Sequence, residues 1–437
     1  MIKLIKTLKM KGICMKKLNT SGYFLSLLFP LVLFLSFKGE QTLSYIILFI
    51  FLISMFSKDN RSCLVNLIDK KLASGLLIFI LSPFAVSLFS GGLSSRVDID
   101  HYLYWIIFFP LVFFINTEGK MWKFLAFFLT GGLLSLCITF IIFINNYDSW
   151  ANPKGFEYPR IHFELQTQDF ANIMCILLLF LLSFILFYRH NNKKRNMLIK
   201  GILTSIFLLN LFIIIVNRSK MVYICLIPTI AYLLYRKNRK YILGFLASCI
   251  GGYFLLPHSI RDRLQYIIKI KEDPSSNLRL IFWDAAISSS LKSPIWGMTT
   301  EERIAFNTEH FKSKGVWEYI ARNYGVSNDI GLTNTHNMYL HHLSYYGVAI
   351  IPLFYFFFIA VPSRLIKLSY YKVSHKGMSA YVALEMALKA SYAAYLIQGI
   401  TEFNLNKKPM IFMCVILLLI LNFIYKKNYQ NNRNSNF

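Results

Sequence analysis

The stretch of sequence that decides the fold is ANIMCILLLFLLSFILFY, residues 171–188, which contains no charged side chain. A helix rises about 1.5 Å per residue, so this run crosses most of a hydrocarbon core that is roughly 30 Å thick. The composition of the chain agrees, because 56% of its 437 residues are hydrophobic, 16% are aromatic and the mean hydropathy is +0.48. Such a composition indicates a membrane-embedded protein and excludes a water-soluble one of this length.

Apolar runs of similar length recur along the whole chain, separated by short polar segments. We predict twelve transmembrane helices, at about 20–37, 42–57, 72–90, 102–116, 124–145, 171–188, 201–216, 221–235, 241–257, 337–360, 379–400 and 409–425. The sequence shows no strand alternation, repeat or glycine-rich linker. We therefore expect an all-α polytopic bundle that forms a single integral membrane domain over residues 1–437.

Basic residues are concentrated in alternate polar segments, which together hold 28 Lys and Arg but only three acidic residues. Cytoplasmic loops retain positive charge, so this pattern predicts that both termini are cytoplasmic and that loops 146–170 and 258–336 are exported. The sequence pI of about 9.7 then reflects topology and contact with membrane lipids, and we expect no nucleic-acid partner. None of the seven cysteines lies in an exported segment, and their spacing is not typical of disulfides or of metal sites.

The loop of residues 258–336 is inserted between the ninth and tenth predicted spans and is balanced in charge. It contains SSNLRLIFWDAAISSSLKSP, residues 275–294, in which apolar residues recur at helical spacing up to Pro294. We predict an amphipathic helix here that lies on the membrane face, with Ser275 and Ser276 as its capping residues.

A cluster of titratable rings occurs in NTHNMYLHHLSYYG, residues 334–347, at the start of the tenth predicted span. His336 falls at the outer membrane boundary, where a neutral imidazole can act as a general base near pH 7. No pair of these histidines has the i, i+4 spacing of a zinc site on one helix. An alternative interpretation is that the rings anchor the helix in the lipid headgroup belt, and it applies most to His341, His342, Tyr345 and Tyr346.

Three basic residues on the predicted exported face are candidates for binding phosphate. Arg218 and Lys220 form nearly the whole turn between two spans, and Arg279 lies in the predicted loop helix. A planar guanidinium binds phosphate oxygens in pairs and is costly to desolvate without an anion. The alternatives are a snorkelling turn residue for Arg218 and an ordinary wet-face arginine for Arg279.

Two further charged groups have competing interpretations. Asp98 and Asp100 form a D-x-D pattern that can hold Mn or Mg for a sugar-phosphate leaving group, although such short acidic patterns also arise by chance. Glu385 and Lys389 lie four residues apart within a predicted span, which favours an ion pair that neutralises both charges inside the bundle.

Several of these segments resemble the O-antigen ligase family of Gram-negative inner membranes, which is related to O-antigen polymerases. The resemblance covers roughly residues 200–410. It is carried by NRSKMV (217–222), NLRLIFWDAAISSSLKSP (277–294), TTEERIAF (299–306), THNMYLHHLSYYG (335–347) and TEFNLNKKP (401–409). Many relatives have a small residue after the first arginine and no lysine, so Lys220 departs from the family pattern.

The resemblance implies a multi-pass protein of the bacterial inner membrane with a glycosyltransferase C-type helical fold and a periplasmic active site. It implies that His336 is the catalytic base and that Arg218 and Arg279 bind pyrophosphate, with Lys220 sharing that charge. The implied reaction transfers a glycan from undecaprenyl pyrophosphate to a sugar hydroxyl of lipid A–core, with inversion. Because pyrophosphate is a good leaving group, we expect neither a metal nor another cofactor.

Three alternatives remain open at the level of sequence. An O-antigen polymerase would use the same donor with a second lipid-linked glycan as acceptor. A lipid-linked glycan flippase would use the arginines only to bind phosphate, but it needs charges distributed along a transport path. A metal-dependent transferase would use Asp98 and Asp100.

Overall fold

The computed structural model describes residues 11–91, 96, 99–152, 160–324, 334–368 and 379–434. These residues form helices and turns and contain no strand, which confirms the all-α expectation for the described part of the chain. The first half contains α2 (Lys11–Leu35), α3 (Phe37–Ser54), α4 (Lys58–Leu67), α5 (Lys70–Phe89), η2 (Ile99–Ile107), α6 (Phe108–Phe114), α7 (Glu118–Asn145), α8 (Tyr147–Ala151), α9 (Thr167–Phe187) and α10 (Lys193–Asn217).

The second half continues with a larger share of short helices. It contains α11 (Lys220–Lys237), α12 (Lys240–Leu255), α13 (His258–Ile268), α14 (Pro274–Lys292), α15 (Thr300–Ser313), α16 (Trp317–Tyr324), α17 (Met338–Tyr346), α18 (Ile350–Phe354), α19 (Val361–Lys367), α20 (Ser379–Gln398) and α21 (Lys408–Asn434). Short helical turns, η4 (Gly347–Ala349) and η5 (Tyr355–Ala360), connect α17, α18 and α19.

Every one of the twelve predicted spans falls on a helix, but the helices differ in their capacity to cross a membrane. Eight helical stretches of the described chain are long and apolar enough to span, and they begin at Lys16, Phe37, Lys70, Glu118, Thr167, Lys193, Met338 and Lys408. The η2–α6 stretch and α12 are apolar but shorter, and α11 and α20 are not among the eight. The chain is therefore a polytopic helical membrane protein, and the count of twelve spans stays a prediction.

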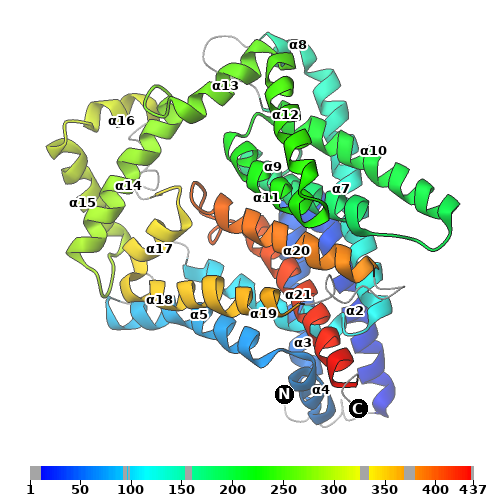
Figure 1. Ribbon diagram of the computed structural model, residues 1–437. Coiled ribbons are helices and arrows are strands. Elements are labelled where there is room, and N and C mark those ends of the chain that lie inside the picture. Colours follow the sequence, from blue (N-terminus) through cyan, green and yellow to red (C-terminus); the bar gives the residue numbers. More distant parts are fainter. Residues whose placement is uncertain are drawn as a thin grey trace.

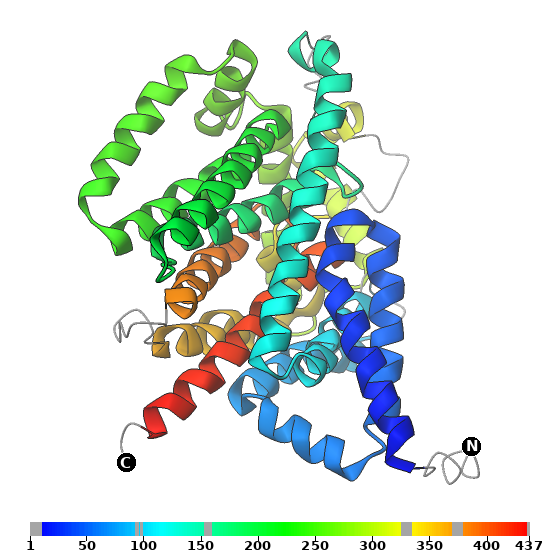
Figure 2. The ribbon, with the colours of Figure 1, turned by 90° about the vertical axis from the view of Figure 1, so that its right-hand side faces the viewer.

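The centre of the bundle is formed by α9 and α21, which are buried over most of their length. Helix α20 packs along α9, and α11 packs against both of them. The long helix α7 and the α2–α3 hairpin form one side of the molecule, where α2 lies against both α3 and α7 (Figure 2). The first turn of α2, the end of α21 and α4 lie at the same end of the molecule, and α8 lies at the opposite end (Figure 1).

The predicted loop 258–336 contains the short helices α13 to α16, and residues 325–333 within it lie outside the described part. Helices α14, α15 and α16 form a small lobe beside α17 (Figure 1), with its own apolar cluster of Leu278, Phe282, Ala285, Phe311 and Ile320. The predicted amphipathic helix is α14, but its N-cap is Asp273, whose side chain accepts a hydrogen bond from the backbone of Ser276. The capping role expected for Ser275 and Ser276 was wrong, because the helix starts earlier, with Pro274 in its first turn.

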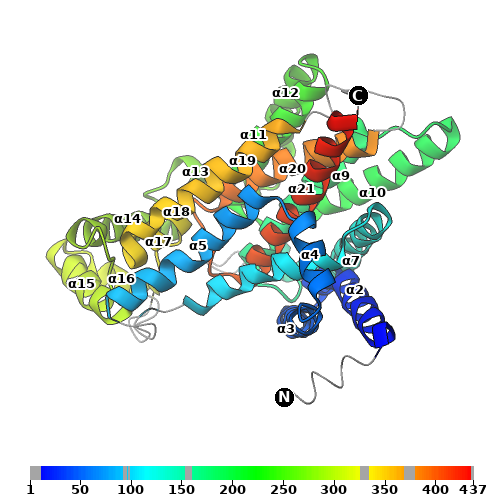
Figure 3. The same ribbon diagram turned by 90° about the horizontal axis from the view of Figure 1, so that it is seen from below.

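The lobe is joined to the bundle where the turn after α14 meets the end of α17. Gly297 and Gly347 both have positive φ angles, of 67° and 49°. A Cβ atom on Gly347 would lie 2.3 Å from the carbonyl oxygen of Ile295, so only glycine permits this approach. Helix α5 lies alongside α18 beneath this junction (Figure 3).

Candidate functional site

The turn between α10 and α11 is formed by Arg218 and Ser219. Arg218 ends α10 in the left-handed conformation, with φ at 60°, and its side chain is completely buried. Its guanidinium stacks on the ring of Trp150, 4.2 Å from the ring centroid, and donates a 3.0 Å hydrogen bond to the Trp150 carbonyl oxygen. The hydroxyl of Ser219 accepts a hydrogen bond from Gln168 at the start of α9. The turn is thus fixed from two sides, and the snorkelling interpretation of Arg218 is wrong because this side chain packs inside the protein.

Lys220 connects this turn to the start of α14. Its ammonium group forms an ion pair with Asp273 and donates a 3.1 Å hydrogen bond to Ser276. Burial alone would raise the pKa of Asp273, but Lys220 and the Ser276 hydrogen bonds hold that pKa below its usual value. Ser276 and Arg279 are three residues apart on α14, so Lys220 approaches the helix face that carries Arg279.

Arg279 belongs to a chain of ion pairs from three distant segments. Its guanidinium is 3.0 Å from a carboxylate oxygen of Glu402, in the turn between α20 and α21. The second oxygen of Glu402 is 2.9 Å from Lys407, and Lys407 is also 2.9 Å from Asp169 on α9. Burial alone would raise the pKa of Glu402, but Lys407 and Arg279 lower it, so this carboxylate is ionised at neutral pH.

His336 is held next to this chain by its backbone. Its φ is 47°, and its backbone N–H donates a 2.9 Å hydrogen bond to the side-chain oxygen of Asn334. Trp283, one turn after Arg279 on α14, donates a hydrogen bond to the carbonyl of Thr335, and Met338 donates one to the carbonyl of Gly399. The same helix therefore orients both Arg279 and the segment that carries His336.

The environment of His336 keeps its imidazole neutral. The pKa of His336 is lowered to about 4, chiefly by burial; the charge of Glu402 raises it, and the positive charges of Arg279 and Lys407 lower it. A neutral ring can accept a proton, and an anion bound among these cations would raise its pKa.

Backbone strain singles out the same residues. Among the described residues, three that are not glycine have positive φ: Glu164, Arg218 and His336. Such conformations cost about 1–3 kcal/mol and persist where the surrounding structure enforces them, often at functional sites. Two of the four residues predicted as site residues therefore have conformations that local sequence would not adopt.

The structure brings His336, Arg279 and Lys220 to one end of the bundle, and Arg218 lies in the turn just before Lys220. Four cations and three carboxylates gather here, namely Arg218, Lys220, Arg279, Lys407, Asp169, Asp273 and Glu402. With His336 neutral, the group has one net positive charge, and three of its cations are already paired with carboxylates. An anionic ligand would exchange these carboxylate contacts for its own oxygens.

The other rings of the 334–347 segment belong to the protein interior. His341 stacks on Phe403, with ring centroids 3.7 Å apart, and His342 accepts the Tyr102 hydroxyl at Nδ1 and donates from Nε2 to the Ala349 carbonyl oxygen. Tyr345 and Tyr346 are also buried. The headgroup-belt interpretation was wrong for these four residues, since they contact protein where lipid headgroups were expected.

The remaining sequence candidates lie away from this group. Asp98 falls outside the described residues, and Asp100 is largely exposed beside His101. Within the described ranges, no three His, Cys, Asp or Glu side chains gather in a way that could hold a metal ion. The predicted ion pair between Glu385 and Lys389 is confirmed, and Glu385 is buried.

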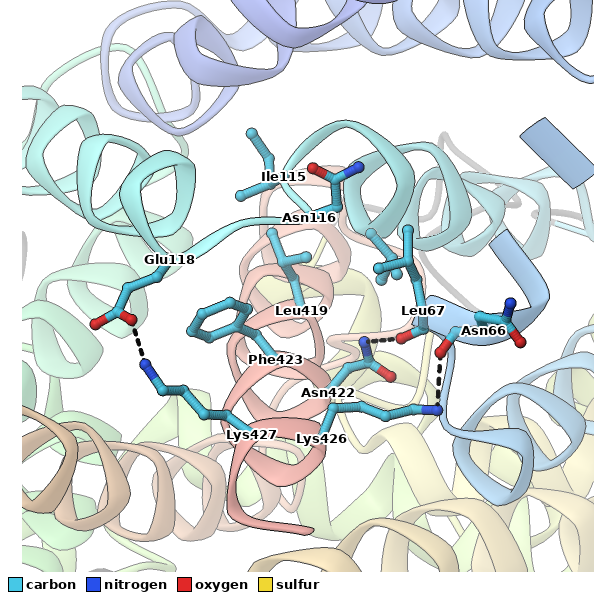
Figure 4. A pocket seen from close by; sticks show the side chains of 11 residues that line it. Asn66, Leu67, Ile115, Asn116, Glu118, Leu419, Asn422, Phe423, Lys426 and Lys427 are labelled. Carbon is cyan, nitrogen blue, oxygen red and sulfur yellow. Dashed lines mark hydrogen bonds and ion pairs between the residues drawn. The ribbon is translucent and has the colours of Figure 1, made fainter. Parts of the chain in front are cut away.

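A cavity of about 300 Å³ lies at the opposite, basic end of the molecule (Figure 4). It is bordered by the end of α4, the turn before α7 and the side of α21, and Figure 4 shows Lys427 paired with Glu118 and Lys426 bonded to the backbone of Asn66. None of the predicted site residues lines it.

The fold and the site define a polytopic helical membrane protein with a cationic site and a neutral histidine at one end of the bundle. Residues 203–355 match the family described as O-antigen ligase. No curated protein matches the chain. The matched segment contains Arg218, Lys220, Arg279 and His336, and it supports membership of the chain in the O-antigen ligase family. Membership implies a glycosyltransferase-type activity in general.

Four residues of this group had no assigned role at the level of sequence: Asp169, Asp273, Glu402 and Lys407. Glu402 and Lys407 lie in the TEFNLNKKP segment that contributed to the resemblance, but their other partners, Arg279 and Asp169, are far away in sequence. Asp169 carries the only acidic side chain in the first turn of α9 and is buried, which is the signal that singles it out.

Proposed function

We propose that this protein is an O-antigen ligase, which transfers a glycan from undecaprenyl pyrophosphate to a sugar hydroxyl of lipid A–core. The observation that carries the proposal is the neutral, strained His336 beside the cations Arg279 and Lys407. A base next to paired cations suits a reaction in which a hydroxyl attacks and a pyrophosphate departs. The family match supports the same general class of reaction.

The proposed mechanism is a single displacement. His336 takes the proton of the acceptor hydroxyl while the hydroxyl oxygen forms a bond to the anomeric carbon of the donor sugar. The bond from that carbon to the pyrophosphate oxygen breaks, and its electron pair leaves with undecaprenyl pyrophosphate. One direct displacement inverts the anomeric centre.

Arg218 and Arg279 are proposed to bind the pyrophosphate, with Lys220 sharing its charge. Glu402 and Asp273 form ion pairs with Arg279 and Lys220. These carboxylates hold the cations in place before the donor arrives, which reduces the reorganisation needed in the reaction. The good leaving group needs no general acid, so we propose that the reaction is independent of metal ions.

The proposed location is the bacterial inner membrane, with both termini cytoplasmic and the site on the periplasmic face. Two features support this orientation. The basic segments at the start of α2 and the end of α21 lie together at one end of the molecule (Figure 1), and none of the site residues lies among them. A glycosyltransferase C-type fold with twelve spans remains part of this proposal.

The first experiment expresses His336→Ala and the unmutated protein at matched membrane levels in a strain that lacks its own ligase. Loss of a general base reduces rates by about 10²–10⁴-fold. We expect the unmutated protein to restore the O-antigen ladder on a lipopolysaccharide gel and the variant to lose it, with accumulation of undecaprenyl-linked glycan.

The matched control is His341→Ala. His341 is a buried histidine on the adjacent helix α17, stacks on Phe403, and has no catalytic role in the proposed mechanism. A ladder of normal intensity from His336→Ala would remove the catalytic assignment. Failure of the unmutated protein to produce any ladder, combined with elongation of a lipid-linked glycan in its membranes, would favour the polymerase alternative.

A further inference from the structure

A second cavity, of about 520 Å³, lies in the lobe at the far end of α14. It is formed by the end of α5, the end of α14, the turn of residues 294–299 and one side of α15. Its side chains combine two aromatic rings with charged groups, namely Trp296, Phe306, Lys292, Glu302 and Glu309. A cavity of this size is within the usual range for small-molecule sites.

Hydrogen bonds between side chains and the backbone fix the walls of this cavity. Arg96 is buried and donates hydrogen bonds to the carbonyl oxygens of Trp296 and Tyr345, at 2.7 and 2.6 Å. Glu302 closes a capping box with Thr299 at the start of α15. The ammonium group of Lys292 lies 5.3 Å from the centroid of the Phe306 ring. The Trp296 side chain stays 43% exposed and is available to a ligand.

Helix α14 places this cavity in line with the proposed active site. Ser293, which borders the cavity and caps α14, follows Arg279 by fourteen positions. Fourteen positions are close to four whole turns of about 3.6 residues, so the two residues face nearly the same direction about 21 Å apart. A ligand bound through pyrophosphate at Arg279 could therefore reach the cavity only if several further groups extended along the helix.

The chemistry of the lining favours a glycan. Flat rings such as Trp296 and Phe306 pack against the C–H faces of sugar rings, and carboxylates such as Glu302 and Glu309 accept hydrogen bonds from sugar hydroxyls. One lysine and two glutamates leave the lining with a negative balance, which disfavours phosphate groups. The cavity thus differs in charge from the cationic site at the other end of α14.

We propose that this cavity binds the glycan chain of the lipid-linked donor, several sugars away from the pyrophosphate. This inference rests on the proposed function, since it takes Arg279 as the position of the pyrophosphate. Short donors would not reach the cavity, whereas long donors would gain contacts from it. The cavity would therefore favour transfer of long chains over short ones.

The test uses the full-length protein in lipid nanodiscs and two variants, Trp296→Ala and Glu309→Gln. The probe is polysaccharide released by mild acid from the lipopolysaccharide of the source cells, separated into long chains and single repeat units. We expect long chains to bind the unmutated protein and both variants to weaken that binding about tenfold. The controls are Phe254→Ala and Glu301→Gln, an exposed aromatic and an exposed carboxylate that do not line the cavity.

In cells that lack their own ligase, the two cavity variants should shift the ladder to short chains, while transfer of a single repeat unit stays at the unmutated level. Equal binding of long chains by the cavity variants and the unmutated protein would overturn the inference, as would a loss that is uniform over all chain lengths. Tighter binding of released core oligosaccharide than of long chains would overturn the assignment to the donor. If long chains bind at the cavity but the unmutated protein restores no ladder, the proposed function fails and the glycan site stands.

Discussion

The pairing of Arg279 with Glu402 shows how single residues prepare this site. Glu402 is buried and Arg279 is partly exposed. The carboxylate of Glu402 therefore fixes the orientation of a guanidinium group that is still partly accessible to solvent. Removing Glu402 would leave the partly buried Arg279 without its carboxylate, whereas removing Arg279 would leave Glu402 paired with Lys407. The pair therefore fixes the orientation of the guanidinium that is proposed to bind phosphate.

Short sequence segments and the family resemblance made His336, Arg279 and Lys220 candidates, and their roles stay predictions. They did not assign Glu402, Lys407 and Asp169, because the pairs Arg279–Glu402 and Asp169–Lys407 each join segments separated by more than a hundred residues. The ionisation state of His336 could not be predicted from sequence either, since it depends on burial by α14 and by the turn after α20. Candidate site residues could thus be predicted from short sequence segments, whereas the ion pairs and the burial that set their charge states could not.

The pKa of His336 predicts an unusual response to acid. An ordinary histidine has a pKa of about 6.5, and activity that needs its neutral form would halve near that pH. Since burial lowers the pKa of His336 to about 4, the free enzyme keeps its base down to that range. We expect kcat/KM to stay level from about pH 8 to pH 5. On acidification, kcat should begin to fall at a higher pH than kcat/KM does, because bound pyrophosphate raises the pKa of His336.

Initial rates with a defined lipid-linked donor in nanodiscs would measure both profiles. Samples returned from each pH to neutral buffer control for irreversible inactivation. Half-loss of kcat/KM near pH 6.5 would contradict the lowered pKa of this histidine.

At the level of elements, the junction between the lobe and α17 depends on two glycines. The segment of residues 334–347 ends at Gly347. A glycine is required there because the turn after α14 packs directly against the end of α17. The contact joins residues fifty positions apart, so no local rule predicts it. The junction fixes α14 relative to α17 and thereby Arg279 relative to His336.

Gly347→Ala should destabilise the protein. The substitution combines a φ of 49° with a Cβ atom 2.3 Å from a carbonyl oxygen, and we expect a loss of about 1–3 kcal/mol in the free energy of unfolding. Thermal unfolding in detergent, followed by intrinsic fluorescence, measures the change. Gly315→Ala is the matched control, because Gly315 also has positive φ but has open space around its Cβ position. An equal loss in both variants would show that backbone conformation, and not the close approach, governs Gly347.

At the level of the whole molecule, hydropathy identified all the apolar helices but could not decide which of them cross. Helix α20 contains Glu385 and Lys389 and packs on the buried helix α9, so protein contacts replace the lipid contacts that hydropathy assumes. Helix α12 is apolar and its side chains are largely exposed, yet it is shorter than a usual span. Composition alone cannot separate such helices, because the deciding contacts are made between distant segments.

The predicted orientation can be tested with single cysteines. Cys63 is exposed on α4, a helix assigned to the cytoplasmic face by its basic neighbours, and Glu318 is exposed on α16 in the predicted exported lobe. In a background with the other cysteines replaced and the ladder retained, a membrane-impermeant maleimide should label Glu318→Cys in cells with a permeable outer membrane. It should label Cys63 only after the inner membrane is opened. Labelling of Cys63 in cells with an intact inner membrane would reverse the topology and place the His336 site in the cytoplasm, where the proposed periplasmic transfer could not occur.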